Sequence, residues 1–304
     1  MTLLDKVIVI TGAGRGIGRA IAVAAAQQGA RVAVLDNGSA ADGAGTDGGP
    51  SREVVETIVA AGGEAMALAV DVEDLDQVRA GVAEVLARWG RIDGIVNNAG
   101  IIIPGDFTQQ APADFERQIR VNLYGAFNMA QAVAQHFKAQ ESGAFVHMTS
   151  SVGLIGSPGL AGYASSKLGI VGLSRTLSFD MAKFKVRSNC VAPSAATRMT
   201  DSGGDSPQAK AYVKRMQQVS PAEKVAPLVL FLLADATQAV TGQIFGCRGD
   251  TIFLYDQPRP IRIAQRGRGW TAQSIASEVM PSWRSSLVPL ETTSDIIRLP
   301  ETAS

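Results

Sequence analysis

Thr11-Gly-Ala-Gly-Arg-Gly-Ile-Gly18 separates four apolar residues at positions 7–10 from an alanine-rich segment at residues 16–28. Glycine permits the sharp turn and the close backbone approach that a strand-to-helix turn over a ligand requires. The N-terminus of a helix after such a turn offers unpaired N–H groups and the positive end of its dipole to a phosphate. This order of strand, turn and helix predicts the first unit of a doubly wound α/β sheet, with a dinucleotide phosphate site at the turn.

Apolar strand-like runs and segments of helical spacing alternate after this turn. We expect strands at residues 7–11, 31–35, 64–70, 92–96, 144–148, 186–191 and 243–245. The apolar spacing predicts helices at residues 16–28, 75–89, 115–138, 163–184 and 227–233. The alternation predicts one α/β Rossmann domain over residues 1–250 with a seven-stranded parallel sheet. Residues 251–304 form a C-terminal extension with two tryptophans, which we expect to pack on the domain or on a partner subunit.

The composition is that of a globular protein without net charge. Lys plus Arg and Asp plus Glu number 28 each, and 46% of the residues are apolar. The lack of a basic excess argues against nucleic-acid binding. Two cysteines and two histidines are too few for a disulfide framework, and we expect no metal site. The apolar run at residues 7–10 is too short for a signal peptide or a membrane span, so we expect a cytoplasmic protein.

Asp36 ends the second expected strand, 18 residues after Gly18. A carboxylate there accepts hydrogen bonds from the adenosine ribose hydroxyls and repels a 2′-phosphate, which favours NAD. Arg15 favours NADP instead, because a guanidinium beside the ribose can pair with a 2′-phosphate. We weigh the carboxylate more heavily and predict NAD, with NADP as the alternative. The segment 37–50, with five glycines, is expected as a flexible loop on the ligand side of the sheet.

Tyr163 and Lys167 are four residues apart in an expected helix and therefore share one face. A tyrosine with its ordinary pKa near 10 transfers protons poorly at neutral pH, and a nearby ammonium favours the phenolate and lowers that pKa. Ser150 follows the fifth expected strand, and a hydroxyl there can bind an oxygen that changes between carbonyl and alcohol. These residues predict proton-coupled chemistry at a carbonyl group.

The order of these motifs resembles that of the short-chain dehydrogenase/reductase family over about residues 5–250. The cradle matches the family's Thr-Gly-x-x-x-Gly-x-Gly, and further matches are Asp71-Val72, Asn97-Asn98-Ala99-Gly100 and Asn122. Pro193-Ser194 departs from the family's Pro-Gly. The resemblance implies a cofactor site formed by Gly12, Gly14, Arg15, Gly16, Ile17, Gly18, Asp36, Asp71, Val72, Asn98, Ala99, Gly100, Tyr163, Lys167, Pro193 and Thr197.

The same resemblance implies a role for each catalytic residue. Tyr163 is the expected general acid/base, and Ser150 positions the carbonyl. Lys167 is expected to lower the pKa of the tyrosine, and Asn122 to hold a water that connects the site to solvent. The family's oligomers use the helix that begins near Tyr163, which implies a homodimer or homotetramer. Residues 194–221, including Ser202-Gly-Gly-Asp205, are expected to form a lid over the substrate.

A narrower resemblance concerns the glycine-rich segment after Asp36, residues 192–200, residues 225–229 and the C-terminal extension. These are similar to the (3R)-hydroxyacyl-CoA dehydrogenase unit of peroxisomal multifunctional enzyme type 2, which oxidises 3-hydroxyacyl-CoA and, in some members, 17β-hydroxysteroids. The resemblance implies an NAD-dependent oxidoreductase acting on the CH–OH group of a small hydrophobic substrate. An NADP-dependent 3-oxoacyl-[acyl-carrier-protein] reductase and a non-catalytic NAD sensor remain alternatives. The cradle lacks the Gly-x-x-Gly-x-x-Gly of the extended isomerases and dehydratases.

Overall fold

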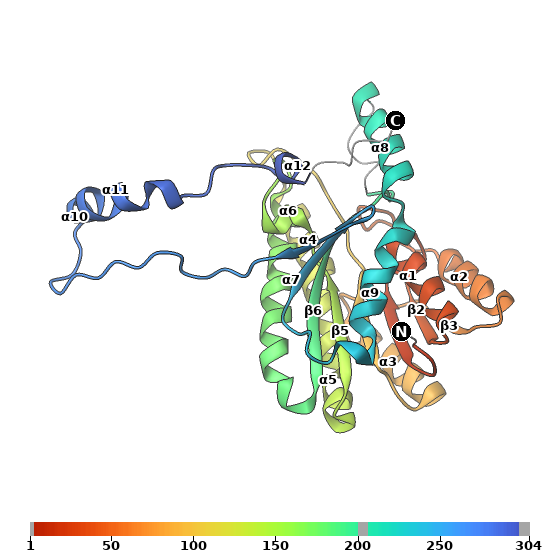
Figure 1. Ribbon diagram of the computed structural model, residues 1–304. Coiled ribbons are helices and arrows are strands. Elements are labelled where there is room, and N and C mark those ends of the chain that lie inside the picture. Colours follow the sequence, from red (N-terminus) through yellow and green to blue (C-terminus); the bar gives the residue numbers. More distant parts are fainter. Residues whose placement is uncertain (1–2, 200–205, 298–304) are drawn as a thin grey trace.

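The computed structural model describes residues 3–199 and 206–297, which surround one eight-stranded sheet (Figure 1). The strand order is β3-β2-β1-β4-β5-β6-β7-β8, so the order reverses between β1 and β4. A ligand crevice forms at such a reversal, beyond the carboxyl ends of the strands. The strands are β1 (Val7–Thr11), β2 (Arg31–Leu35), β3 (Glu64–Leu68), β4 (Gly94–Asn97), β5 (Gly143–Met148), β6 (Val186–Ser194), β7 (Ile244–Arg248) and β8 (Thr251–Tyr255).

The last strand corrects the expected strand count. The first seven strands are parallel, as predicted, whereas β8 pairs antiparallel with β7. The turn between them contains Gly249 with φ of +56°, a backbone conformation that glycine adopts without strain. A strand at residues 251–255 therefore belongs to the sheet, although the sequence analysis assigned these residues to the extension.

Helices cover both faces of the sheet. One face packs against α1 (Gly16–Gln27), α2 (Gly49–Ala60) and α9 (Ala226–Leu233). The other packs against α3 (Leu75–Trp89), α5 (Gly125–Gln140) and α7 (Ala161–Asp180). Successive residues of a strand point to opposite faces, so Ile8 and Ile10 enter the first core and Val7 and Val9 the second. Apolar clusters thus cover the sheet on both faces.

Two helical regions differ from the sequence expectation. The expected helix at residues 115–138 is divided into α4 (Pro112–Gln118), the π-helical segment η1 (Ile119–Tyr124) and α5. The helix α2 was not expected, because the sequence analysis assigned no element to residues 51–63. Further short helices are α6 (Ser151–Leu154), α10 (Ala272–Ser274), α11 (Met280–Trp283) and α12 (Thr293–Ile296).

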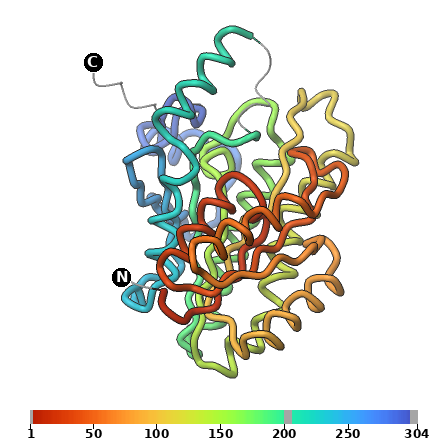
Figure 2. The backbone as a smooth tube through the Cα atoms, turned by 90° about the vertical axis from the view of Figure 1, so that its right-hand side faces the viewer, coloured from red at the N-terminus to blue at the C-terminus, as the bar shows by residue number. Residues whose placement is uncertain are grey.

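The helix α8 (Pro207–Val219) projects beyond the carboxyl end of the sheet, as both views of the backbone show (Figures 1 and 2). It lies within the segment 194–221 that the sequence analysis named as a lid. The glycine-containing stretch at 202–205 lies outside the described residues.

Residues 256–287, here called the arm, leave the body after β8 and return before α12 (Figure 1). The arm carries α10 and α11 near its tip, and its two legs are joined where the Arg262 guanidinium donates to the Ser286 hydroxyl at 2.9 Å. Residues 293–297 lie on the body again, where Thr293 N donates to the Gly156 carbonyl at 3.0 Å. No helix among the described residues is long and apolar enough to cross a membrane.

Candidate active site

The glycine cradle is fixed by contacts that leave no room for side chains. A Cβ at Gly12 would lie 2.8 Å from the Ala99 Cα, and one at Gly18 would lie 2.6 Å from the Asn98 amide nitrogen. Gly12 and Gly16 have φ of +61° and +53°, which side chains disfavour. Backbone packing therefore requires glycine at these positions, and a ligand that approaches the backbone closely would require it as well.

Two polar side chains hold the cradle against the neighbouring strand. The Thr11 hydroxyl accepts hydrogen bonds from the backbone N–H groups of Asn98 and Ala99, both at 3.0 Å. The Asn98 amide donates to the carbonyls of Thr11 and Gly12, both at 3.0 Å. The ends of β1 and β4 are thus joined at the topological switch point, where the crevice opens.

The carboxylate of Asp36 lies at the end of β2 and faces the cradle. Its oxygens accept hydrogen bonds from Gly14 N and Gly38 N, both at 2.7 Å. These two bonds fix the orientation of the carboxylate, while its remaining lone pairs stay available to a ligand. This is the placement from which a carboxylate can reach ribose hydroxyls.

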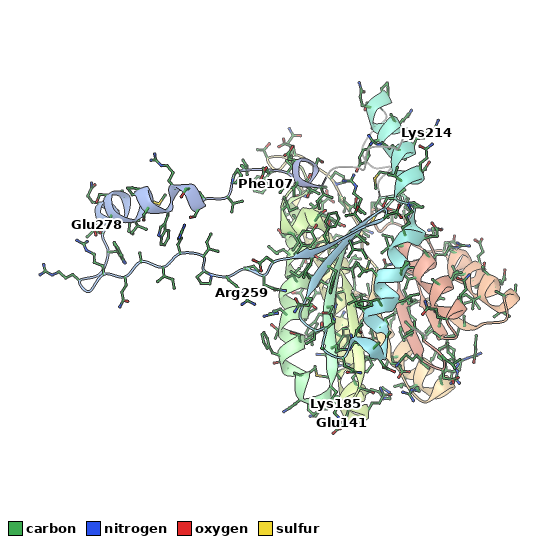
Figure 3. All side chains as sticks on the ribbon, in the orientation of Figure 1. Phe107, Glu141, Lys185, Lys214, Arg259 and Glu278 are labelled. Carbon is green, nitrogen blue, oxygen red and sulfur yellow. The ribbon has the colours of Figure 1, made fainter. Side chains whose placement is uncertain are left out.

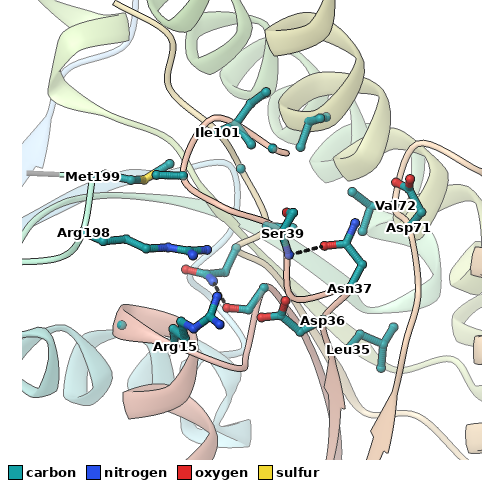
Figure 4. A pocket seen from close by; sticks show the side chains of 18 of the residues that line it. Arg15, Leu35, Asp36, Asn37, Ser39, Asp71, Val72, Ile101, Arg198 and Met199 are labelled. Carbon is teal, nitrogen blue, oxygen red and sulfur yellow. Dashed lines mark hydrogen bonds between the residues drawn. The ribbon is translucent and has the colours of Figure 1, made fainter. Parts of the chain in front are cut away.

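A cleft of about 640 Å³ runs from this carboxylate along the carboxyl ends of the strands (Figure 4). Most of the expected cofactor residues line it: Gly12, Arg15, Gly16, Ile17, Asp36, Asp71, Val72, Asn98, Ala99, Gly100 and Thr197. Gly14, Gly18 and Pro193 are not among the lining residues. Gly14 and Gly18 lie within the cradle turn, and Pro193 pairs in register with Cys247 inside the sheet.

The cleft is also lined by residues that the sequence analysis missed. Arg198 reaches toward Arg15 and Asp36 from the segment after β6 (Figure 4). Arg117 of α4 lines the cleft and donates to the Gly43 carbonyl at 2.5 Å. No motif in the sequence around Arg117 indicates a ligand site. Arg198, in contrast, directly follows Thr197, so its position next to an expected cofactor residue could have predicted it.

Residues 39–46 of the β2–α2 loop form one wall of the cleft. The Ala41 carbonyl accepts a hydrogen bond from Ile102 N at 3.2 Å, so the loop is joined to the segment after β4. This bond and the hydrogen bond from Arg117 to the Gly43 carbonyl hold the loop against the opposite wall of the cleft. The glycine-rich segment therefore lies on the ligand side of the sheet.

Asn122 lies in the π-helical segment η1 and is buried. Its amide oxygen accepts from Ile101 N at 2.8 Å, and its amide nitrogen donates to the Ile101 carbonyl and the Ser166 hydroxyl. A local π-helical widening is often associated with functional positions. Here it sets Asn122 beside the glycine that ends the Asn-Asn-Ala-Gly motif, since a Cβ at Gly100 would lie 3.0 Å from the Asn122 oxygen.

Ser150, Tyr163 and Lys167 meet at one place, beside the carboxyl end of β5. The side chains of Tyr163 and Ser150 are hydrogen-bonded to each other. The Lys167 ammonium lies 5.7 Å from the centre of the Tyr163 ring and donates to the Met148 carbonyl at 2.9 Å. Ser150 also caps α6 by accepting from Val152 N at 3.1 Å. None of these three lines the cleft described above.

The direction of the tyrosine pKa differs from the sequence expectation. Burial raises the pKa of Tyr163 above its usual value, and the hydrogen bond from Ser150 opposes this effect. Burial also lowers the pKa of Lys167 to about 8. Desolvation disfavours the charged form of each group, and burial is the largest influence on both pKa values.

A buried polar row crosses the sheet next to Lys167. Asn97, His147 and Cys190 are register partners on β4, β5 and β6, and the Asn97 amide donates to His147 Nδ1 at 3.0 Å. Burial lowers the pKa of His147 to about 4 and raises that of Cys190 to about 12, so both are neutral at pH 7. His147 is fully buried in the strand and does not reach the cleft.

The cleft fits a dinucleotide. The cradle leaves no room for a Cβ, as close approach of a pyrophosphate to the backbone would require, and α1 begins at Gly16 with its N-terminus toward the cleft. The Asp36 carboxylate faces the cradle, where it could accept from ribose hydroxyls. Thr197 packs over the cradle, because a Cβ at Gly16 would lie 3.4 Å from its methyl group. The cleft thus offers a phosphate site and a ribose acceptor, and its lining residue Gly100 borders the Lys167 ammonium.

Comparison with known proteins agrees with this geometry. Residues 6–208 match the family model described as short chain dehydrogenase. A short-chain type dehydrogenase/reductase of Mycobacterium tuberculosis is 38% identical over 76% of this chain and 78% of its own. The 3-oxoacyl-[acyl-carrier-protein] reductase FabG of Thermotoga maritima is 34% identical over 83% of this chain and 100% of its own.

Two further similarities concern a multifunctional protein and a solved structure. Peroxisomal multifunctional enzyme type 2 of Mus musculus is 36% identical over 77% of this chain, which corresponds to only 30% of that protein. The crystal structure of a short chain dehydrogenase from Mycobacterium avium superposes with a TM-score of 0.83 at 30% identity and covers 96% of this chain and 99% of its own.

The chain belongs to the short-chain dehydrogenase/reductase family. It is an NAD(P)-dependent oxidoreductase, and its relatives include both acyl-carrier-protein reductases and the peroxisomal multifunctional enzymes.

Proposed function

We propose that this protein is an NAD-dependent dehydrogenase that interconverts a secondary alcohol and a ketone on a hydrophobic substrate, such as a 3-hydroxyacyl-CoA or a hydroxysteroid. The observation that carries the proposal is the hydrogen-bonded pair of Ser150 and Tyr163 beside the Lys167 ammonium. Two hydroxyl groups and one cation at a single place suit an oxygen that gains and loses a proton.

In the proposed reaction, the Tyr163 hydroxyl donates a proton to the substrate oxygen during reduction and takes it back during oxidation. Ser150 donates a hydrogen bond to the same oxygen and holds it in place. A bound nicotinamide would exchange the hydride with the carbon that carries this oxygen. Lys167 uses one N–H on the Met148 carbonyl, which leaves two donors for a ribose hydroxyl and for the tyrosine oxygen.

Proton exchange with solvent would pass through Lys167 and a water held at Asn122. The positions support this path, because a Cβ at Gly100 would lie 3.3 Å from the Lys167 ammonium nitrogen and 3.0 Å from the Asn122 oxygen. The lowered lysine pKa, about 8, suits a group that passes protons near neutral pH.

The preference for NAD rests on Asp36, which would accept hydrogen bonds from the ribose hydroxyls and repel a 2′-phosphate. The second candidate is an NADP-dependent 3-oxoacyl-thioester reductase. It is favoured by Arg15 and Arg198, two guanidinium groups that line the same cleft as Asp36, and Arg198 interacts electrostatically with that carboxylate. The similarity to FabG supports this candidate, and that to multifunctional enzyme type 2 supports the first.

The non-catalytic sensor is disfavoured by the retention of all four expected catalytic residues. We also propose a cytoplasmic location, because two free, buried cysteines suit a reducing compartment.

The test follows the absorbance of reduced nicotinamide with NAD and NADP, each offered with (3R)-hydroxyacyl-CoAs, 17β-hydroxysteroids and small secondary alcohols. We expect NAD-linked turnover of one of the first two classes. NADP-linked reduction of 3-oxoacyl thioesters would establish the second candidate instead. Cofactor binding without turnover of any substrate in the panel would count against both.

The variant Tyr163→Phe tests the acid/base role in the same assay. It keeps the ring and removes the hydroxyl, so we expect unchanged cofactor affinity and a loss of nearly all turnover, on the order of 100-fold or more. Tyr255→Phe, on β8, is the matched control: its hydroxyl has no hydrogen-bond partner among the described residues, so activity should be retained. More than about a tenth of wild-type turnover in Tyr163→Phe would remove Tyr163 from this role.

A further inference from the structure

The helix α7, which carries Tyr163 and Lys167, lies along β5 and β6 and extends to the end of the body where Glu141 and Lys185 project (Figure 3). Interlocking side chains fix the relative position of packed elements, but most buried residues of α7 are small. They are Gly162, Ser166, Lys167, Ile170, Val171, Ser174 and Ser178. Apolar burial is not directional, so this face determines the position of α7 along the strands weakly. Hydrogen bonds must contribute to that position.

Three consecutive residues at and after the carboxyl end of β5 supply such bonds. The Met148 carbonyl accepts from the Lys167 ammonium at 2.9 Å, and Ser150 is hydrogen-bonded to Tyr163. Between them, the Thr149 hydroxyl donates to the backbone carbonyl of Lys167 at 2.6 Å. Lys167 is therefore held at both its backbone and its ammonium by neighbouring residues of one chain segment.

Thr149 has the properties of a rigid spacer between the sheet and the helix. The residue is 2% exposed, so its hydroxyl is removed from water and requires a partner. Its backbone N–H donates to the Val191 carbonyl at 2.8 Å, which continues the pairing of β5 with β6. A threonine is branched at Cβ and has few rotamers. The position of the sheet is thus transmitted through one stiff side chain to the Lys167 carbonyl.

Gly153 of α6 contacts the same turn of α7. A Cβ at Gly153 would lie 2.9 Å from the Leu168 backbone nitrogen and 3.0 Å from the Lys167 Cβ. Gly153 is not among the described glycines with positive φ, so the close approach, and not the backbone conformation, requires glycine here. Two separate contacts, one polar and one steric, therefore determine where this turn lies.

The ammonium that this turn carries is sensitive to its position. Lys167 is 4% exposed, and burial lowers its pKa to about 8. The titratable groups around it are Tyr163 on its own helix, with the ring centre 5.7 Å away, Cys190 on β6 and His147 on β5, the register partner of Cys190. Charge interactions strengthen steeply as groups leave water. A displacement of α7 would therefore change the protonation of both Lys167 and Tyr163.

We propose that Thr149 is a positioning residue: its hydroxyl fixes α7 against β5, so that the Lys167 ammonium and the Tyr163 hydroxyl reach the oxygen that Ser150 binds. The inference rests on the proposed function, which gives Ser150, Tyr163 and Lys167 their roles. Thr149 does not line the cleft and acts through the backbone of Lys167.

The variant Thr149→Val tests this role, because it keeps the branched shape and removes the hydroxyl. With an alcohol of the panel above that the wild type oxidises, we expect kcat to fall by about 10-fold or more, since small misplacements of reacting groups are costly. The pH dependence of kcat should move upward by about one unit, because a displaced ammonium favours the phenolate less. Thr149→Ser retains the hydroxyl and should restore both properties to nearly wild-type values.

A second readout needs neither substrate nor cofactor. The Lys167 side chain is titrated by NMR with isotope-labelled lysine, and its signal is assigned by its absence in Lys167→Met. We expect a midpoint near pH 8 in the wild type. The midpoint should move toward the ordinary lysine value in Thr149→Val, because a loosened ammonium regains water. Gly153→Ala displaces the same turn from α6 and should move the midpoint in the same direction.

Thr237→Val is the matched control. Thr237 is 3% exposed, and its hydroxyl donates to the Ala234 carbonyl at 2.7 Å. This contact lies at the amino end of β6, where Arg187 also donates to the Ala234 carbonyl. Removing the Thr237 hydroxyl should cost about 1–3 kcal/mol of stability, as for other buried polar partners. The Lys167 midpoint and the pH dependence of kcat should stay those of the wild type.

The outcomes separate this proposal from the proposed function. A Thr149→Val protein with a lower melting temperature but a wild-type Lys167 midpoint would overturn the positioning role, since a merely structural threonine gives that result. Thr149→Ser that behaves like Thr149→Val would also overturn it. Turnover retained in Tyr163→Phe, or no turnover by the wild type, would instead contradict the proposed function, and the NMR titration alone then decides whether Thr149 holds Lys167.

Discussion

Among single residues, Asp36 has a carboxylate held by two backbone N–H groups at 2.7 Å, and we propose that it binds the ribose hydroxyls of the cofactor. Removing it in Asp36→Ala takes away the acceptor for the ribose hydroxyls and the charge that opposes a 2′-phosphate. Hydrogen bonds to charged groups contribute about 1.5–3 kcal/mol, so we expect the NAD-to-NADP ratio of kcat/KM to fall by 10- to 100-fold. Steady-state kinetics with both cofactors measure this ratio.

Asp76→Ala is the control for that ratio, because Asp76 lies in the exposed first turn of α3, where it pairs with Arg79, and is not among the residues that line the cleft. An unchanged ratio in Asp36→Ala would remove this carboxylate from the ribose site. A rise in NADP activity that depends on Arg198 would show that the two arginines can hold a 2′-phosphate.

His147 makes the stability of the protein depend on pH. Its pKa is lowered to about 4 by burial, against 6.5 for an unfolded histidine. Between these values the unfolded chain binds a proton that the folded chain does not, so the free energy of unfolding decreases as the pH falls from 6.5 to 4. The full effect of this one group is about 3 kcal/mol, from 1.36 kcal/mol per pKa unit.

The measurement compares urea unfolding at pH 7 and pH 4.5. We expect His147→Gln to lose less stability over this interval than the wild type, because no buried imidazole then resists protonation. His136→Gln is the natural control, since the chain has only these two histidines and His136 is bonded to Gln140 near a helix end. Equal losses in all three proteins would assign acid sensitivity to other groups.

At the scale of elements, the cradle and α1 depend on an approach that only glycine permits. A Cβ at Gly18 would collide with the Gly12 carbonyl and lie 2.6 Å from the Asn98 amide. Gly18→Ala should therefore displace the cradle, lower the melting temperature and weaken cofactor binding at least 10-fold, as calorimetry would show. Gly105→Ala, with no heavy atom within 4 Å of its added Cβ, should change neither.

Sequence pattern predicted most elements, because hydrophobic periodicity is local. It did not predict the division of residues 112–140 into α4, η1 and α5, since the cause is distant: Asn122 bonds to Ile101, and a periodic pattern contains no information on that contact. It also missed α2, where the glycines up to Gly49 hid a helix that begins with Pro50 at its first turn.

The site shows the same division between local and distant causes. Motif spacing predicted the residues of the cradle, and the resemblance to the family predicted that Ser150, Tyr163 and Lys167 act as a group. The structure brings these three residues together. Arg117 and Arg198 reach the cleft from segments far from the cradle in sequence, so only the fold reveals them. The raised pKa of Tyr163 likewise depends on burial, which residue spacing does not report.

At the scale of the whole molecule, β8 and the arm extend the chain beyond the family domain. The C-terminal segment after the arm then returns to the side of the body where we expect the substrate. Arg248 joins the parts that meet there. Its guanidinium donates to the Ile297 carbonyl and to the Tyr212 hydroxyl, the latter at 3.3 Å. A buried arginine on β7 thus links the C-terminal segment to α8, the helix within the expected lid.

Arg248→Leu keeps much of the side-chain volume and removes both links. We expect faster hydrogen exchange at residues 207–219 and 292–297, with the amides of β1 and β4 unchanged, because those strands are held by two separate cores. The loss of stability should be about 1–3 kcal/mol, as for a buried polar partner removed. Arg79→Leu on the exposed face of α3 should leave exchange at both segments as in the wild type. If α8 and the C-terminal segment responded separately, with only one exchanging faster in Arg248→Leu, the arm and the substrate side would be independent units. A joint response would mean that whatever holds the arm also steadies α8.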